Sequence, residues 1–120
     1  MLLQQYNEKM KTTSYYKPQF FKTFVENLNE PLSVPELADK FQISPVYLHK
    51  LFKQIFYKSP KQVLKDMRIL NAKMLLALTD KSITEIAASC GFSNPVYFAE
   101  VFKSSAGVSP SQYRKNTKKG

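Results

Sequence analysis

The chain has 120 residues, 18 of them Lys or Arg and 9 Asp or Glu, which gives a net charge of +9 at pH 7. Its length suits one compact domain or two very small ones, and its charge suggests a polyanionic partner such as nucleic acid or an anionic membrane, although a soluble basic surface would share this composition. A single cysteine excludes an internal disulfide, no apolar run approaches the ~18 residues of a membrane span, and the polar residues after Leu3 exclude a signal peptide.

The chain begins with a segment that has no apolar pattern. Residues 1–16 are predicted to be a leader or linker. An amphipathic helix that packs on the following unit is expected next, because apolar residues recur at helical spacing: Phe20, Phe21, Phe24, Val25 and Leu28.

The rest of the chain contains one pattern twice. The run of residues 33–53 returns at residues 82–103, with Asn94 as the one residue added, and Ser59-Pro60 returns as Ser109-Pro110. One structural unit has therefore been used twice. Each copy predicts a short helix, a tight turn and a longer helix, the arrangement that places a helix in the major groove of DNA.

Capping residues set the predicted helix boundaries. Ser33 and Ser82 each precede a glutamate at the third helical position, which predicts two reciprocal capping boxes. Ser44-Pro45 and Asn94-Pro95 start the longer helices, roughly residues 45–56 and 95–105. The predicted core stripes of the longer helices are Leu48, Leu51, Phe52 and Ile55, and then Phe98, Val101 and Phe102. Tyr47 and Tyr97 lie beside these stripes and are expected to pack between helices.

Ser59-Pro60 opens a long helix that is expected to end near residue 78 and to be about 28 Å long. It is expected to hold the two units at a fixed separation. Its predicted apolar stripe is Val63, Leu64, Met67, Leu70, Met74, Leu75 and Leu78, and the two methionines of this stripe are expected to be core residues. The sequence thus predicts a first unit at residues 17–58, a linker helix at 59–79 and a second unit with a basic tail at 80–120.

The two units differ in two respects. Gly107, which can end a helix cheaply in the left-handed conformation, corresponds to Tyr57, so the first unit is expected to end its longer helix differently. Residues 50–73 carry seven basic side chains against Asp66, whereas residues 82–113 carry Glu85 and Glu100 against one lysine. The DNA footprint is therefore expected to be lopsided.

The second unit resembles the AraC/XylS family of bacterial transcription regulators, on the motifs Gly91-Phe92-Ser93-Asn94, Tyr97-Phe98, Phe102-Lys103, Gly107-Val108-Ser109-Pro110 and Gln112-Tyr113-Arg114. The resemblance covers about residues 20–115. It implies an all-α fold in which two tandem, homeodomain-like helix-turn-helix units are joined by a long linker helix. It also implies a bacterial, cytoplasmic, sequence-specific regulator, usually an activator that helps to recruit RNA polymerase to double-stranded DNA. In most members a sensor or dimerisation domain precedes this one, so the chain is either a stand-alone member or a C-terminal fragment, and the leader favours the fragment.

Outward-facing side chains near the start of each longer helix are the candidates for base reading. Lys50 can donate to guanine, His49 can bond a base edge and Val46 can meet a thymine methyl group. Glu100 can accept from cytosine or, alternatively, repel phosphates. The positions that match the family's base-reading sites are Val46, His49, Lys50, Pro95, Val96, Ala99 and Glu100. For His49 a solvated or phosphate-bound histidine stays an alternative, and for Val46 an incidental surface residue.

Phosphate contacts fix the register of a protein on DNA without reading sequence. The candidates are Lys53, Lys58, Ser59, Lys61, Lys103 and Ser109. The two serines would offer backbone N–H groups at helix N-termini; their alternative is a purely capping role.

Catalysis finds little support in the sequence, and no cofactor is expected. His49 and Cys90 lie in different repeats and are too few for a zinc site or a Cys/His nucleophile pair, so Cys90 is expected to be a small buried apolar residue. Two other functions stay open beside a sequence-specific regulator: a sequence-blind nucleic-acid-binding protein and a helical protein-interaction module.

Overall fold

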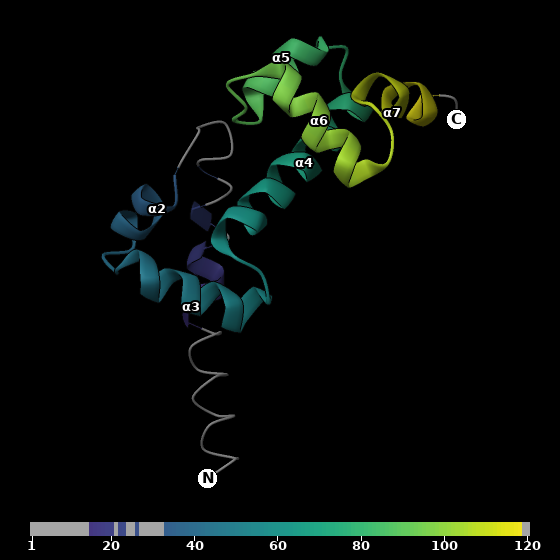
Figure 1. Cartoon of the computed structure of the whole chain (residues 1–120). Helices are drawn as coiled ribbons and strands as arrows, with labels where there is room; N and C mark the ends of the chain where they lie inside the picture. Colours follow the sequence, from purple (N-terminus) through teal and green to yellow (C-terminus); the bar gives the residue numbers. More distant parts are fainter. Residues whose placement is uncertain (1–14, 21, 24–25, 27–32, 119–120) are drawn as a thin grey trace. The chain divides into compact units, whose positions relative to one another are not determined.

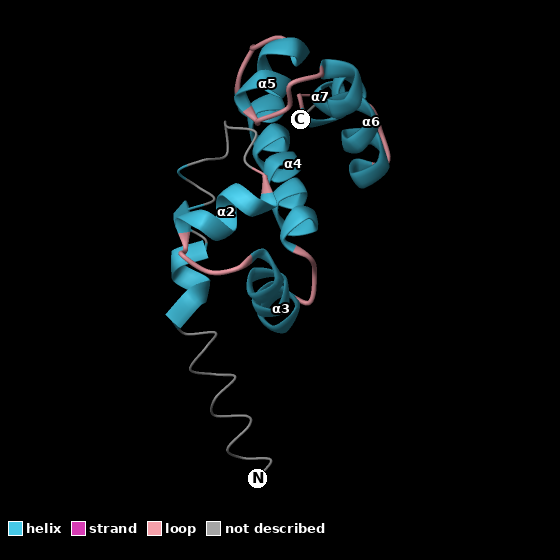
Figure 2. Ribbon diagram, turned by 60° about the vertical axis from the view of Figure 1, so that its left-hand side comes forward, coloured by secondary structure: helices cyan, strands magenta, loops and turns pink. Residues whose placement is uncertain are grey.

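The computed structural model describes residues 15–20, 22–23, 26 and 33–118, and the regular secondary structure of this part is helical throughout, which confirms the predicted all-α class (Figures 1 and 2). After a helical segment at residues 15–20, the helices are α2 (Val34–Lys40), α3 (Pro45–Phe56), α4 (Pro60–Leu78), α5 (Ile83–Ser89), α6 (Pro95–Ala106) and α7 (Pro110–Thr117). The chain forms two compact units, and the division between them falls inside α4, after Leu64.

The helix starts are built by the predicted caps. Ser82 and Glu85 form the reciprocal capping box at α5. At α2 the glutamate is used differently, because the Glu36 Oε1 atom accepts from the Ser33 hydroxyl at 3.0 Å while the Ser33 Oγ atom accepts from the Glu36 N–H at 3.3 Å. The serines that precede α3, α4 and α7 also accept from a backbone N–H three residues ahead: Ser44, Ser59 and Ser109.

The core of the first unit is aromatic and aliphatic. Phe20 is fully buried, and its ring centroid lies 4.7 Å from that of Phe41 and 4.6 Å from that of Phe52. Leu48, Leu51, Phe52 and Ile55 are buried along α3, as predicted. The helix expected before the repeat thus contributes Phe20 to this core, whereas Phe21, Phe24, Val25 and Leu28 lie outside the described residues.

The second unit has its own core. Its buried residues come from α4, α5, α6 and the turn between α5 and α6: Ile69, Ala72, Leu76, Ile86, Ala87, Cys90, Phe92, Phe98 and Phe102. Tyr113 of α7 packs against this cluster, with its ring centroid 5.5 Å from that of Phe102. Val101, predicted as core, is only partly buried at its edge.

The predicted apolar stripe of α4 is wrong over its second half. Val63 and Leu64 are buried, but from there on the buried face consists of Ile69, Ala72 and Leu76. Met74 is 54% exposed and Met67 is partly buried, so neither is the core residue that was expected; Leu70 and Leu78 are exposed as well. The helix carries two apolar stripes, and the sequence pattern alone does not say which one meets the second core.

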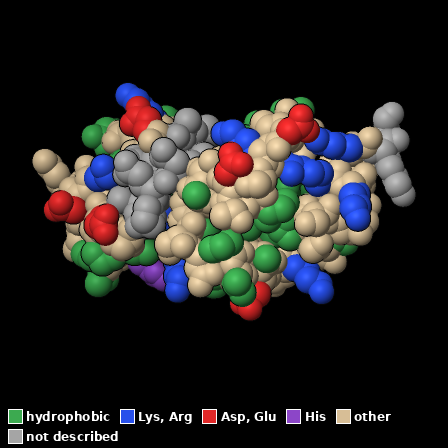
Figure 3. Space-filling model, turned by 90° about the horizontal axis from the view of Figure 1, so that it is seen from above, with side chains coloured by type: hydrophobic (Ala, Val, Ile, Leu, Met, Phe, Trp, Pro, Cys, Tyr) green, Lys and Arg blue, Asp and Glu red, His purple; other side chains and the backbone are tan. Residues whose placement is uncertain are grey.

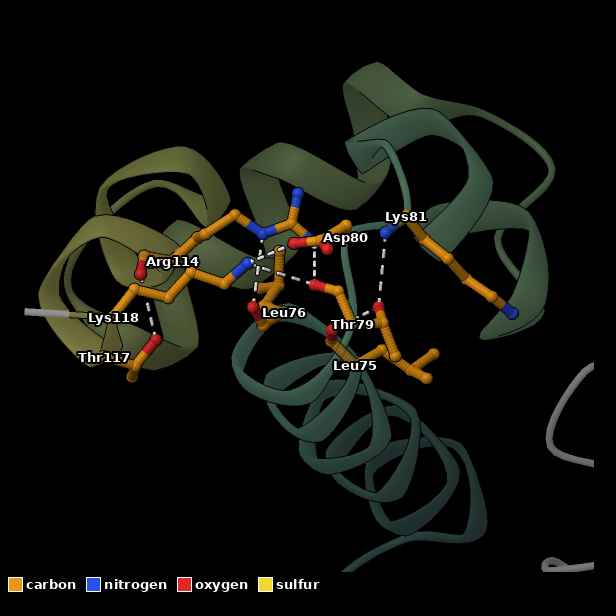
Figure 4. A network of polar contacts seen from close by, with 8 residues as sticks. All are labelled: Leu75, Leu76, Thr79, Asp80, Lys81, Arg114, Thr117 and Lys118. Carbon is orange, nitrogen blue, oxygen red and sulfur yellow. Dashed lines mark hydrogen bonds and ion pairs between the residues drawn. The ribbon is translucent and has the colours of Figure 1, made fainter.

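The end of α4 is fixed by side chains from α7 and from Lys118, the residue that follows it (Figure 4). The Arg114 guanidinium donates to two carbonyl oxygens, from Nε to Leu76 at 3.2 Å and from a terminal nitrogen to Thr79 at 3.3 Å. The Lys118 Nζ atom lies 3.4 Å from the Thr79 oxygen and 2.7 Å from Asp80 Oδ1. Cations placed at a helix C-terminus satisfy carbonyl groups that have no partner within the helix.

The expected difference between the ends of α3 and α6 is wrong. Tyr57 adopts the same left-handed conformation as Gly107, and its N–H donates to the Lys53 oxygen at 3.2 Å. A second pair of this kind lies in the turns before α3 and α6. There Gln42 of the first unit (φ 55°) occupies the position of Gly91 in the second (φ 84°). The first unit therefore reproduces, with two non-glycine residues, the backbone that glycines allow in the second.

Candidate nucleic-acid interface

The exposed side of α3 begins at its first turn. Pro45 occupies the first helical position and Val46 the second, where 81% of the valine is exposed to solvent. His49, Lys50 and Lys53 are also exposed, whereas the intervening Leu48, Leu51 and Phe52 are buried. The helix thus turns its apolar stripe toward the core and leaves the predicted base-reading residues Val46, His49 and Lys50 accessible.

The start of α6 is built in the same way from different side chains. Asn94 accepts from the Val96 N–H at 2.8 Å and from the Tyr97 N–H at 3.2 Å, so the inserted residue serves as the N-cap. Pro95, Val96 and Glu100 are exposed and Ala99 is partly buried. Of these candidates only Glu100 carries a hydrogen-bonding side chain.

The basic side chains between residues 50 and 73 divide into two groups. Lys50, Lys53, Lys58 and Lys61 are exposed, on α3, in the following turn and at the start of α4. Lys65, Arg68 and Lys73 are partly buried along α4, and desolvation lowers the pKa of Arg68. Lys and Arg side chains occur at many points of the surface shown in Figure 3, with acidic and apolar side chains between them. The exposed lysines are therefore the part of this charge that lies at the surface of the first unit.

The predicted phosphate-binding serines both cap a helix. Ser59 and Ser109 accept from the N–H groups of Gln62 and Gln112 at 3.2 and 3.1 Å. Lys103, the remaining predicted phosphate contact, is exposed in the last turn of α6.

Two tyrosines at the start of the recognition helices are more accessible than expected. Tyr47 hydrogen-bonds to Tyr16, and the centroid of the Tyr97 ring lies 6.2 Å from that of Phe92, so each tyrosine contacts a neighbouring aromatic residue. Nevertheless 41% of Tyr47 and 45% of Tyr97 is exposed. The sequence feature that could have indicated this exposure is their matched position in the two repeats, where each tyrosine directly follows a candidate base-reading valine.

No other chemical centre is found in the described part of the chain. It contains no group of three or more His, Cys, Asp or Glu side chains arranged to hold a metal ion. Cys90 is buried, as predicted, and its burial raises the pKa of the thiol to about 11. None of the helices in residues 15–118 that the structure describes is long and apolar enough to cross a membrane.

Two short helix pairs, each with an exposed face on its second helix, define a duplicated helix-turn-helix DNA-binding domain. The family model described as "Helix-turn-helix domain" matches residues 37–116. The chain belongs to the AraC/XylS family of transcription regulators, and its described part is a DNA-binding domain of that family.

Two of the similar proteins are named as regulators. The chain is 34% identical over 94 residues to the HTH-type transcriptional regulator ArgR of Pseudomonas aeruginosa. This alignment covers 78% of this chain and 29% of the relative. It is 31% identical over 109 residues to the melibiose operon regulatory protein of Escherichia coli, covering 91% of this chain and 36% of the relative. The chain therefore spans about a third of the length of these curated relatives.

A solved structure shows a similar domain on DNA. It is the DNA-binding domain of AdpA, a global transcriptional factor, in complex with a target DNA. The two domains superpose with a TM-score of 0.79 at 31% identity, over 82% of this chain and 89% of that one.

Proposed function

We propose that this chain binds a specific double-stranded DNA site, with the N-terminal halves of α3 and α6 in successive major grooves, and so regulates transcription. The observation that carries the proposal is the set of side chains at the start of the two helices, on the side opposite the buried stripes, all of them exposed except the partly buried Ala99: Val46, His49, Lys50, Pro95, Val96, Ala99 and Glu100. In helix-turn-helix proteins this part of the recognition helix meets the base edges.

Phosphate contacts supply affinity in this proposal. Lys53, Lys58, Lys61 and Lys103 are exposed around the two recognition helices, and each lysine that neutralises a phosphate releases condensed counterions. Ser59 and Ser109 present the N-termini of α4 and α7, where backbone N–H groups favour an anion. These contacts position the domain, and the recognition helices supply the sequence preference.

Activation, rather than repression, is the direction we propose. One relative, the HTH-type transcriptional activator RhaS of Escherichia fergusonii, is 35% identical over 89 residues. RNA polymerase would then be the protein partner, in the bacterial cytoplasm, and an effector-binding or dimerisation domain would belong to the two thirds of the relatives that this chain does not span.

A non-enzymatic role is part of the proposal. One relative, from Bacillus subtilis, is named as a bifunctional transcriptional activator and DNA repair enzyme. In the described part of this chain the one thiol is the buried Cys90, whose raised pKa keeps it protonated at neutral pH. A thiolate nucleophile would need a lowered pKa and access to its substrate.

Selection of bound sites from a random pool of duplex DNA tests the proposal. We expect one preferred, non-palindromic sequence with two separated blocks, because the two recognition helices carry different side chains. Binding that is equally strong to all sequences in the presence of competitor DNA would instead identify a sequence-blind binder. Binding partners that persist after DNA is removed, without any affinity for DNA, would identify a protein-interaction module.

A further inference from the structure

The two recognition helices begin with the same three residues. Pro45-Val46-Tyr47 opens α3 and Pro95-Val96-Tyr97 opens α6. Many other residues common to both units have a structural role, because they cap a helix or, like Phe52 and Phe102, are fully buried. The valines do neither, since the two residues are 81% and 66% exposed.

The structure presents both valines in the same way. Each is the second residue of a helix of 12 residues that starts with proline after a capping side chain, Ser44 or Asn94. Two residues further on, a fully buried side chain fixes the helix to its own unit, Leu48 in α3 and Phe98 in α6. Each valine side chain therefore projects from the first turn of its helix, on the side that faces away from the core of its unit.

The chemistry of valine restricts what it can recognise on DNA. It has no donor or acceptor, and its β-branched side chain strongly prefers one rotamer in a helix, so little conformational entropy is lost when it makes a contact. Contact with a phosphate or a polar base edge would desolvate that group without replacing its hydrogen bonds. The apolar group on a base edge in the major groove is the C5-methyl group of thymine.

We propose that Val46 and Val96 each contact a thymine methyl group, so that the DNA site carries a thymine at the equivalent place in both of its half-sites. This inference rests on the proposed function, because both helices must lie in a major groove. The next candidate positions of the two helices differ, with the exposed His49 and Lys50 in α3 against the partly buried Ala99 and the exposed Glu100 in α6. The half-sites therefore share the thymine and differ in the neighbouring bases.

Uracil substitution tests the inference, because it removes only the C5-methyl group. Each thymine of the selected site is replaced in turn, and the affinity of the full chain is measured. We expect one position in each half-site at which uracil weakens binding about fourfold, the value of one buried methyl group. Val46→Ala should abolish the sensitivity at one position and Val96→Ala at the other, whereas Ser104→Ala, an exposed change later in α6, should keep both.

The outcomes separate this inference from the proposed function. A selected site that binds tightly but tolerates uracil everywhere, or valine variants that retain both sensitivities, would overturn the thymine contacts and leave specific DNA binding intact. A selection that returns no preferred sequence would overturn both. Both valine variants are expected to stay folded, because the valines are exposed and alanine has a higher helix propensity than valine.

Discussion

Tyr57 and Gly107 occupy the same place in the two units and adopt the same left-handed backbone, with φ 61° and φ 83°. Each ends a recognition helix by donating its N–H to the carbonyl oxygen four residues earlier, Lys53 or Lys103. Glycine adopts this conformation freely, whereas a residue with a Cβ atom loses roughly 1–2 kcal/mol. The first unit is therefore strained at a position where the second is not.

A glycine at position 57 and a non-glycine residue at position 107 should change the free energy of unfolding in opposite directions. Tyr57→Gly should raise the free energy of unfolding by about 0.5–1 kcal/mol, because relief of backbone strain exceeds the entropy that glycine adds to the unfolded chain. Gly107→Ala should lower it by about 1 kcal/mol. The added Cβ would meet nothing within 4 Å, so this loss comes from the backbone.

Urea denaturation followed by circular dichroism measures both changes. Gly107→Asn is the control, because asparagine tolerates the left-handed region better than alanine and should lose less. A Tyr57→Gly variant that is markedly less stable than the parent would show that contacts of the tyrosine side chain outweigh its strain.

Arg114 should matter for folding more than for DNA binding. Its guanidinium joins α7 to the carbonyl groups of Leu76 and Thr79 at the end of α4. Arg114→Ala should lower the free energy of unfolding by about 1–3 kcal/mol, the range for a hydrogen bond to a charged group or an acceptor left without one. Lys115→Ala, an exposed change on the same helix, is the matched control and should have little effect. Equal stability of the two variants in a thermal melt would contradict this role.

The helix boundaries were predictable because they depend on local chemistry. Serine or asparagine followed by proline fixes the start of a helix within a few residues of chain, and α3 and α4 begin and end where the sequence indicated. The left-handed Tyr57 was not predictable by the same reasoning. Its propensity opposes that conformation, and the packing of the whole unit decides the outcome.

Tertiary packing also explains the misplaced stripe of α4. Both possible stripes of this helix have helical spacing, and the choice of Ile69, Ala72 and Leu76 over Leu70, Met74 and Leu78 depends on where α5 and α6 lie. The exposed start of each recognition helix was predictable, because it is what remains after the core stripe is removed. Which bases these side chains contact depends on the DNA.

Burial of Cys90 predicts a loss of stability at alkaline pH. The folded chain raises the pKa of this thiol from 9.0 to about 11 because burial disfavours the thiolate. The raised pKa means that the unfolded chain ionises first, so the contribution is fully present below about pH 9 and is lost between about pH 9 and 11. Cys90→Ala should show a smaller alkaline loss than the parent, although it is less stable at neutral pH. Parallel stability curves for the two proteins above pH 9 would refute this.

DNA binding should weaken strongly as salt is added. Lys50, Lys53, Lys58 and Lys61 are all exposed in the first unit, and each phosphate contact contributes about −0.9 to the slope of log affinity against log salt. Lys61→Ala should make that slope shallower by about 1 and weaken all sequences alike, whereas Lys40→Ala on α2 should change it less. A parental slope shallower than about −2, measured by fluorescence anisotropy, would argue against a major-groove footprint.

The first recognition helix should dominate sequence reading. At matched positions α3 exposes His49 and Lys50, whereas α6 carries Ala99 and Glu100. A good base contact discriminates by about 1–3 kcal/mol, so Lys50→Ala should weaken binding to the selected site roughly tenfold and blur one block of its sequence. Ala99→Gly should affect DNA contact little, beyond its cost in helix propensity. Equal losses from Lys50→Ala and Glu100→Ala would overturn this asymmetry.

Glu100 distinguishes two forms of that prediction. It is exposed on α6, where a carboxylate can either accept from cytosine N4 or lie close to phosphate groups that repel it. Glu100→Gln removes the charge with almost no change in shape. We expect tighter binding to every sequence, and the gain should shrink as salt screens the repulsion. Weaker binding to the selected site alone, with other sequences unaffected, would instead assign Glu100 to a cytosine and give the second helix a direct part in reading the site.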